Sequence, residues 1–214
     1  MLTVHHLGIS QSDRIVWLCE ELEIPYKLVR YERDAVTRLA PPEYKALYEF
    51  GTAPVITDGN RVLGESGAII EYIVAKYGAG RLSIASDSPD FPDYLFWLHF
   101  ANGSFMAAGM VDLVVNMTGA AKAESDTVRS IRSRLDRAFS MTEKRLHRAP
   151  YFAGSEFTAA DIIMLFPLST MRAFAPRDLA GHPNIRNYLQ RIAARPAYQR
   201  AMQKADPGFK PPMS

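Results

Sequence analysis

Cysteine is nearly absent from this sequence, and its scarcity removes two kinds of site at once. Cys19 is the only cysteine among 214 residues, so the chain can form neither an internal disulfide nor a cysteine-based metal cluster. The five histidines are scattered, and no two of them share the spacing of a metal-binding helix near a carboxylate. We therefore expect no bound metal.

An excess of charge of one sign is also lacking. The net charge is +2, with acidic and basic residues interspersed, so binding to nucleic acid or to an anionic membrane is not expected. No apolar run is expected to approach the roughly 18 residues that cross a bilayer. The first six residues do not resemble a signal peptide, and the single cysteine suits a reducing compartment. The simplest expectation is a cytoplasmic protein.

What is present in residues 1–78 predicts a mixed α/β unit in the order β-α-β-α-β-β-α. Strands are expected at 2–7, 26–31, 54–57 and 61–63, and helices at 12–22, from 41 onward and at 66–77. The Asp58-Gly59 pair between the last two strands is typical of a hairpin. Because a crossover helix joins the first two strands, these should pair in parallel, whereas the hairpin is antiparallel.

The remainder of the chain shows helical periodicity alone. Small and polar residues at 79–89 indicate a linker. Helices are expected at 92–117, 124–147, 159–168 and 184–194, with a short one after Pro196. The segment 159–168 is apolar nearly all round and should be central and buried. Thr158 and Asp161 form a capping box before it, which we interpret as a folding signal.

Ser10 and Ser12 stand where the first strand ends and the first helix begins. A hydroxyl there lies beside unpaired backbone N–H groups and the positive end of a helix dipole, which stabilises an anion, and a thiolate in particular. Either serine could instead only cap the helix, and Ser12 is the more plausible cap. Cys19 lies on the apolar face of the same helix and is expected to be a buried filler.

Two further segments in this half could hold a ligand. A cis bond before Pro54 would turn the Ala53 backbone outward to pair with an extended peptide, although an ordinary trans bond is the more common alternative. Glu65 and Ser66 open the third helix, where a hydroxyl and helix N–H groups suit a carboxylate and Glu65 suits an ammonium group. A plain N-cap by Ser66 is the alternative there.

Taken together, these features resemble the glutathione S-transferase family over essentially the whole chain. The motifs follow the family's order: Ser10-Gln11 with Arg14 at the first helix, the run 51–56 before the hairpin, the run 65–70 at the third helix, and a capped buried helix in an all-helical half. The likeness is greatest to the serine-type bacterial and fungal branch, with kinship to the theta class.

The resemblance implies a thioredoxin-like domain at 1–78 and an all-helical domain at 90–214 that contributes the electrophile pocket. It implies that Ser10 activates glutathione, which is the co-substrate, and that Ala53 beside a cis Pro54 pairs with the cysteinyl unit. Glu65 and Ser66 would hold the γ-glutamyl end.

The expected reaction is attack of the glutathione thiolate on a small hydrophobic electrophile. Met106 and Met110 are candidates for lining the pocket, although methionines at helical spacing are more often core. Glutathione-dependent peroxide reduction, dehalogenation, and a non-catalytic binding protein remain alternatives. A homodimer is expected, in which Phe50 is either an aromatic key for the partner or a core residue of its own chain.

Two positions depart from the family pattern. Thr52, which belongs to the expected glutathione site, stands where relatives usually carry lysine or glutamine. Tyr48-Glu49 replaces a frequent His-Pro pair. Losing a cation and adding an acid should weaken the binding of an anionic tripeptide, unless another basic residue such as Arg38 compensates.

Overall fold

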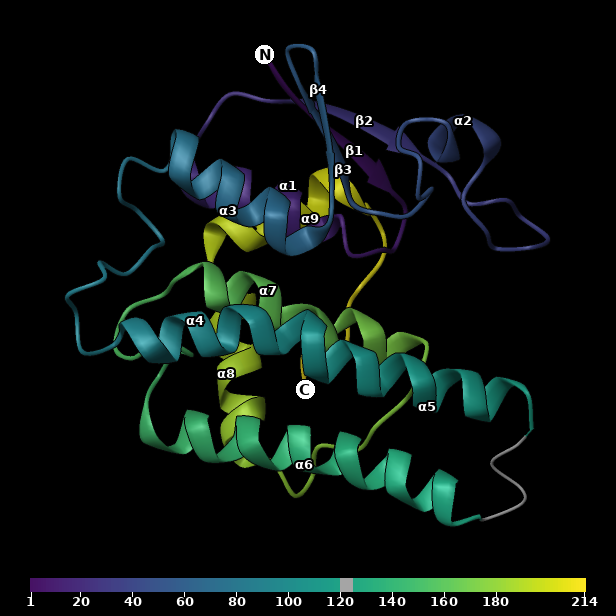
Figure 1. Cartoon of the computed structure of the whole chain (residues 1–214), viewed down its shortest axis with the longest axis vertical. Helices are drawn as coiled ribbons and strands as arrows, with labels where there is room; N and C mark the ends of the chain where they lie inside the picture. Colours follow the sequence, from purple (N-terminus) through teal and green to yellow (C-terminus); the bar gives the residue numbers. More distant parts are fainter. Residues whose placement is uncertain (120–124) are drawn as a thin grey trace. The chain divides into compact units, whose positions relative to one another are not determined.

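The computed structural model describes residues 1–119 and 125–214. They form two compact units, Met1–Ser83 with Ile192–Lys210, and Ile84–Arg191 with Pro211–Ser214 (Figure 1). The domain boundaries expected from the sequence, at 78 and 90, stay a prediction; the compact units differ from them chiefly because segment 192–210 packs with the first unit. Glu124, the expected start of one helix, lies outside the described residues.

The first unit is built on a four-stranded mixed sheet. Its strands are β1 (Leu2–Leu7), β2 (Lys27–Tyr31), β3 (Val55–Asp58) and β4 (Arg61–Gly64), in the order β2-β1-β3-β4. β1 pairs in parallel with β2 and antiparallel with β3, and β3 with β4 forms the antiparallel hairpin. Gly59 makes the hairpin turn with a φ of 58°, a value that glycine adopts without a steric penalty. The pairing matches the mixed sheet that the sequence predicts.

Four helices belong to the first unit: α1 (Asp13–Leu22), α2 (Pro42–Lys45), α3 (Ser66–Tyr77) and α9 (Pro196–Ala205). Figure 1 shows α1, α3 and α9 side by side, with α2 apart from them. The last helix packs on α1 through the edge contact between Trp17 and Tyr198, whose ring centroids are 5.2 Å apart. Ion pairs join the same two segments, from Arg195 to Glu21 at 2.7 Å and from Arg200 to Glu20 at 3.1 Å. These contacts explain why the C-terminal segment belongs to this unit.

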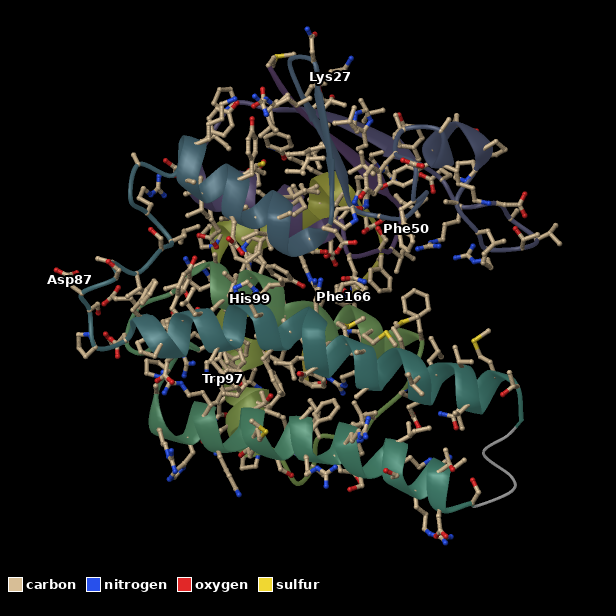
Figure 2. The ribbon with its side chains drawn as sticks, viewed as in Figure 1. Lys27, Phe50, Asp87, Trp97, His99 and Phe166 are labelled. Atoms are coloured by element: carbon tan, nitrogen blue, oxygen red, sulfur yellow. The ribbon has the colours of Figure 1, made fainter. Side chains whose placement is uncertain are left out.

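Among its described residues, the second unit has helices and helical turns and no strands. Its elements are α4 (Phe91–Phe100), the π-helical turn η1 (Ala101–Met106), α5 (Ala107–Met117), α6 (Asp126–Arg148), α7 (Ala159–Leu168), the 3₁₀ turn η3 (Thr170–Ala173) and α8 (Pro183–Ala193), the last of which ends in the first unit. Every residue of α7 is buried, as predicted. The capping box of Thr158 and Asp161 is confirmed. Trp97 of α4 lies among packed aromatic rings, and the centroid of its ring is 5.1 Å from that of Phe152 (Figure 2).

One expectation about apolar length is wrong. α4, η1 and α5 form a continuous helical run, Phe91–Met117, that by length and composition is long and apolar enough to cross a bilayer. Its most apolar window has a mean hydropathy of 1.3, and 28% of that window is buried. The same composition suits the central helix of a bundle, and Leu98 and Phe105 on this run are core residues of the second unit. A single helix of this kind is weak evidence for a membrane span, and the absence of a membrane partner stays a prediction.

Candidate active site

Three segments that are distant in the sequence meet at one edge of the sheet. The register pairs His5 of β1 with Val55 of β3, and Val55 with Gly64 of β4. Because neighbouring strands here are antiparallel, the end of β1, the start of β3 and the end of β4 lie at the same edge. The loop after β1, the Ala53-Pro54 pair before β3 and the start of α3 after β4 are therefore neighbours.

The loop after β1 carries two buried hydroxyls at hydrogen-bond distance from each other. Ser10 Oγ lies 2.8 Å from Ser12 Oγ and donates to the Leu7 carbonyl at 2.7 Å. Ser10 keeps 6% of its surface exposed, whereas Ser12 is fully buried. Of the two serines, Ser10 is the less buried.

The expectation that Ser12 caps the first helix is wrong for its side chain. Ser12 occupies the N-cap position of α1 but makes no side-chain cap hydrogen bond. Its Oγ instead accepts from the Leu7 N–H at 3.1 Å and lies 2.9 Å from Nδ1 of His6. The hydroxyl is turned back toward the strand because these partners surround it.

His6 and Asp206 are members of this cluster that the sequence reasoning missed. His6 is fully buried, and its Nε2 lies 3.1 Å from Asp206 Oδ1. The same carboxylate oxygen accepts the Ile9 N–H at 2.9 Å. A signal for His6 was available in its place on the first predicted strand, and both His5 and His6 are buried there. The sequence offers no comparable signal for Asp206, which lies 200 residues away.

The segment before β3 has the geometry that the family pattern implies. The Ala53–Pro54 peptide bond is cis. Pro54 is buried and Ala53 half-buried, and Thr52 is exposed. Tyr48, one of the two departures, packs so closely on Gly64 that a Cβ at that position would lie 2.4 Å from the tyrosine ring. A tyrosine here therefore requires glycine at the end of β4.

The start of α3 corrects the prediction that Ser66 is an N-cap. Glu65 holds the cap position with a φ of 68°, and Ser66 is the first helical residue, without a cap hydrogen bond from either side chain. The Ser66 hydroxyl donates instead to Gln11 Oε1 at 3.4 Å, and Arg14 donates to the same oxygen at 3.0 Å. This shared acceptor ties the start of α3 to the loop after β1.

Two groups near the loop, one charged and one reactive, are buried. Burial lowers the pKa of the Arg14 guanidinium to about 9, so it is still a cation at neutral pH. Burial, with a contribution from Glu20, raises the pKa of the Cys19 thiol to about 12. Cys19 is fully buried, which confirms the interpretation of this residue as a filler.

Arg33 binds the backbone of the loop after β1. Arg33 donates to the Gly8 carbonyl at 2.8 Å and to the Ile9 carbonyl at 3.2 Å. Arg38, the residue suggested as a compensating cation, is exposed and lines the same cavity of about 380 Å³ as Gly8, Ile9 and Asp206. No group of three or more His, Cys, Asp or Glu side chains that could hold a metal occurs within residues 1–119 and 125–214.

The helical unit holds a cavity of about 290 Å³ among η1, α5, α6 and the segment after α7, with a mainly apolar lining that also includes Asp112, Asn116, Arg172 and Arg177. Met106 lines it and packs with Phe166 and Met171. Met110 does not line this cavity and is 43% exposed. The two methionines, considered together at helical spacing, therefore have different surroundings.

Comparisons with known proteins identify the same family in both halves of the chain. Residues 5–81 match the model of the glutathione S-transferase N-terminal domain, and residues 105–196 match that of the C-terminal domain. The chain is 34% identical to glutathione S-transferase 3 of Schizosaccharomyces pombe, over 96% of this chain and 88% of the relative. It is 26% identical to glutathione S-transferase GstB of Escherichia coli, over 90% of this chain and 93% of that one.

Solved structures give the same result. A glutathione S-transferase from Actinobacillus pleuropneumoniae is 33% identical, with a TM-score of 0.88, over 97% of this chain and 95% of that one. A sphingomonad glutathione S-transferase complexed with glutathione has a TM-score of 0.75 at 24% identity, over 95% and 98% of the two chains, which shows a shared fold.

Proposed function

The chain belongs to the glutathione S-transferase family and is a glutathione transferase, and on that premise we propose that Ser10 activates glutathione as a thiolate. The observation that carries the proposal is the placement of Ser10. It is the less buried of the two hydroxyls in the loop that leads into α1, at the sheet edge where Ala53-Pro54 and the start of α3 also lie. We further infer a place in the serine-type bacterial and fungal branch, supported by Ser10 and by relatives of both origins.

The energies that this site requires are within the range of ordinary interactions. A free thiol has a pKa of about 8.5, and lowering it by about two units requires about 2.7 kcal/mol. A hydrogen bond to a charged group contributes about 1.5–3 kcal/mol, and a helix N-terminus up to about 2 kcal/mol. A hydroxyl at the start of α1 is therefore sufficient to hold a thiolate at neutral pH.

Three other segments would bind the rest of glutathione. The Ala53 backbone, turned by the cis bond, pairs with the cysteinyl unit in this proposal, with Thr52 beside it. Glu65 pairs with the γ-glutamyl ammonium group, and Ser66 with its carboxylate at the start of α3. Because Thr52 supplies no cation, Arg38 is the candidate for compensating the missing charge, and its exposure leaves it accessible.

The electrophile is a small hydrophobic molecule in this proposal. The support is the mainly apolar cavity lined by Met106, Met171 and Phe174 within the helical unit. Met110 lies outside that cavity, so the cavity supports Met106 as a lining residue and leaves the role of Met110 a prediction.

We also propose a homodimer in the cytoplasm, with Phe50 as the aromatic key. Phe50 is 72% exposed, so it is not a core residue of its own chain (Figure 2). An apolar groove of about 430 Å³ runs between α4–η1–α5 and α6, lined by Phe100, Val111 and Met141 among others. A groove of this size accommodates an aromatic ring from a second copy.

The test combines retention on immobilised glutathione with a conjugation assay that uses an aromatic electrophile. We expect the wild-type chain to be retained and to form the conjugate, and Arg38→Ala to weaken retention while leaving turnover at saturating glutathione unchanged. Leu39→Ala, an exposed neighbour in the same loop, is the matched control. Retention without conjugate formation for every electrophile would contradict the thiolate-attack proposal.

A further inference from the structure

A buried chain of polar atoms connects Ser10 to a carboxylate at the far end of the sequence. It runs from Ser10 Oγ to Ser12 Oγ over 2.8 Å, and from Ser12 Oγ to His6 Nδ1 over 2.9 Å. It continues from His6 Nε2 to Asp206 Oδ1 over 3.1 Å. Both interior members, Ser12 and His6, are fully buried, so water does not interrupt the chain.

The direction of the hydrogen bonds follows from the carboxylate. Burial alone would raise the pKa of Asp206, but the His6 contact, the Ile9 N–H and the charge of Arg30 outweigh it, so the pKa is lowered and the group is ionised. His6 Nε2 faces this carboxylate at 3.1 Å, and a carboxylate only accepts, so we assign the N–H of the imidazole to Nε2 and the lone pair to Nδ1. Ser12 then donates its proton to Nδ1, and its oxygen can accept from Ser10 once the Ser10 hydroxyl turns from the Leu7 carbonyl to Ser12.

We propose that this chain is a proton relay, in which His6 receives the proton that glutathione loses when its thiolate forms at Ser10. The inference rests on the proposed role of Ser10. The thiol passes its proton to Ser10 Oγ, Ser10 passes its own to Ser12 Oγ, and Ser12 passes its own to His6 Nδ1. The S–H bond breaks and an N–H bond forms, the sulfur keeps the electron pair, and each serine ends with one proton. No oxidant or reductant is needed.

The final arrangement stabilises both new charges. Each hydroxyl now donates toward the sulfur, so Ser10 holds the thiolate, and the imidazolium lies between Ser12 and the ionised Asp206. Arg30, Glu32, Arg33 and Arg38 line the same cavity as Asp206, and the charges of Arg30 and Arg33 act on it. Asp13, at the start of α1, is a further charged group near the chain. The relay is the Ser–His–Asp arrangement extended by one serine.

The Asp206 end of the chain reaches a cavity of about 380 Å³. Asp206 lines this cavity together with Gly8, Ile9 and Arg38, the cation proposed for glutathione. Protons can exchange between Asp206 and the contents of this cavity, which resets His6 after the reaction.

The distinguishing measurement compares the thiolate formed with the protons released. Thiolate is followed by its ultraviolet absorbance, and proton release by calorimetry in two buffers with different protonation enthalpies at neutral pH. S-methylglutathione, which has no thiol proton, gives the background for the rest of the molecule. With a relay, the wild-type enzyme forms thiolate with far less than one proton released per thiolate. One proton per thiolate in the wild type would overturn the proposal.

Variants separate the relay from a structural role. Asp206→Asn can still accept the Ile9 N–H but cannot balance an imidazolium, so thiolate at neutral pH should fall about tenfold or more, with one proton released for each thiolate. His6→Asn offers Ser12 an acceptor that cannot take a proton, and should behave in the same way. Adding Asp206→Asn to His6→Asn should cause no further loss of thiolate.

Two controls complete the design. Asp58→Asn removes a carboxylate of the same unit that binds Lys76, Tyr72 and Tyr77; it should lower stability and keep the wild-type proton ratio. If Ser10→Ala forms thiolate normally, the proposed role of Ser10 fails. If Ser10→Ala loses thiolate while Asp206→Asn and His6→Asn form it as the wild type does, only the relay fails.

Discussion

Replacing Ser10 by alanine removes the hydroxyl that the proposal assigns to the thiolate. The Ser10 oxygen lies 2.7 Å from the Leu7 carbonyl and 2.8 Å from Ser12 Oγ, both neutral acceptors. A thiolate is a charged acceptor, so the hydrogen bond to it is worth about 1.5–3 kcal/mol. Its loss should raise the pKa of the bound thiol by about one to two units. Turnover at neutral pH should then fall about ten- to a hundredfold.

Ser12→Ala provides the contrast, and the structure changes its expected cost. As a simple helix cap, Ser12 would contribute about 1 kcal/mol. The hydroxyl instead satisfies the buried Leu7 N–H and His6 Nδ1. Leaving either group without a partner costs about 1–3 kcal/mol, so Ser12→Ala should destabilise the fold more than Ser10→Ala does. Because Ser12 also lies within the relay, its loss should reduce thiolate formation as well.

The assay records thiolate absorbance against pH and thermal unfolding for both variants, with glutathione affinity measured alongside. We expect Ser10→Ala to show a raised thiol pKa, nearly unchanged affinity and a small loss of stability. A normal thiol pKa in Ser10→Ala, together with a raised thiol pKa in Ser12→Ala, would show that Ser12 activates glutathione and that Ser10 does not. An unchanged thiol pKa in both variants would refute hydroxyl activation.

Phe50→Ala should shift the dimer toward monomer in sedimentation at micromolar concentration, because the exposed ring loses its place in a partner's groove; Leu39→Ala should not, and an unaltered dimer would exclude the key. Cys19→Ala should leave turnover within a few-fold after correction for stability, and a complete loss in a folded variant would contradict its role as a filler. Asp161→Ala strips the acceptor from the buried Phe152 and Thr158 N–H groups, which should cost about 2–6 kcal/mol in chemical denaturation; a loss below about 0.5 kcal/mol would show that water replaces the carboxylate. The pKa of Asp58 is lowered by its hydrogen bonds with Lys76, Tyr77 and Tyr72. Its contribution to stability is therefore present above the unfolded pKa of about 3.9 and lost as pH falls below it, and an Asp58→Asn curve parallel to the wild type in acid would exclude this.

The order of elements could be predicted because each depends on local chemistry. The Asp58-Gly59 pair requires a turn, and the spacing of Ile15, Leu18 and Leu22 buries one face of a helix. The packing of segment 192–210 on α1 could not be predicted in this way. It depends on the contacts of Glu20 and Glu21 with Arg200 and Arg195, and charged side chains of this kind read equally well as a solvated helix face.

The parts of the candidate site that could be predicted from the sequence are those set by backbone conformation and chain position. The cis bond at Ala53–Pro54 and the position of Ser10 follow the family pattern, and the structure places them at one sheet edge. The hydrogen-bond partners of the serine side chains could not be predicted in this way. Ser12 and Ser66 stand at helix starts, where serine usually caps, but the buried Leu7 N–H and the Gln11 side chain compete for their hydroxyls. Local preference does not decide between such partners, because tertiary contacts supply the alternatives.

The backbone at the site gives a physical reason why the local rules fail there. Ile9 has a φ of 47° and Glu65 a φ of 68°, values that cost a residue with a side chain about 1–3 kcal/mol. A β-branched isoleucine is especially disfavoured in this region. Ile9 is held by Asp206 at its N–H and by Arg33 at its carbonyl. The two strained residues directly precede Ser10 and Ser66, the two side chains that the proposal assigns to glutathione. The carboxylate that keeps Ile9 in place is the same one that faces His6, so the positioning of Ser10 and the proposed relay depend on one residue, Asp206.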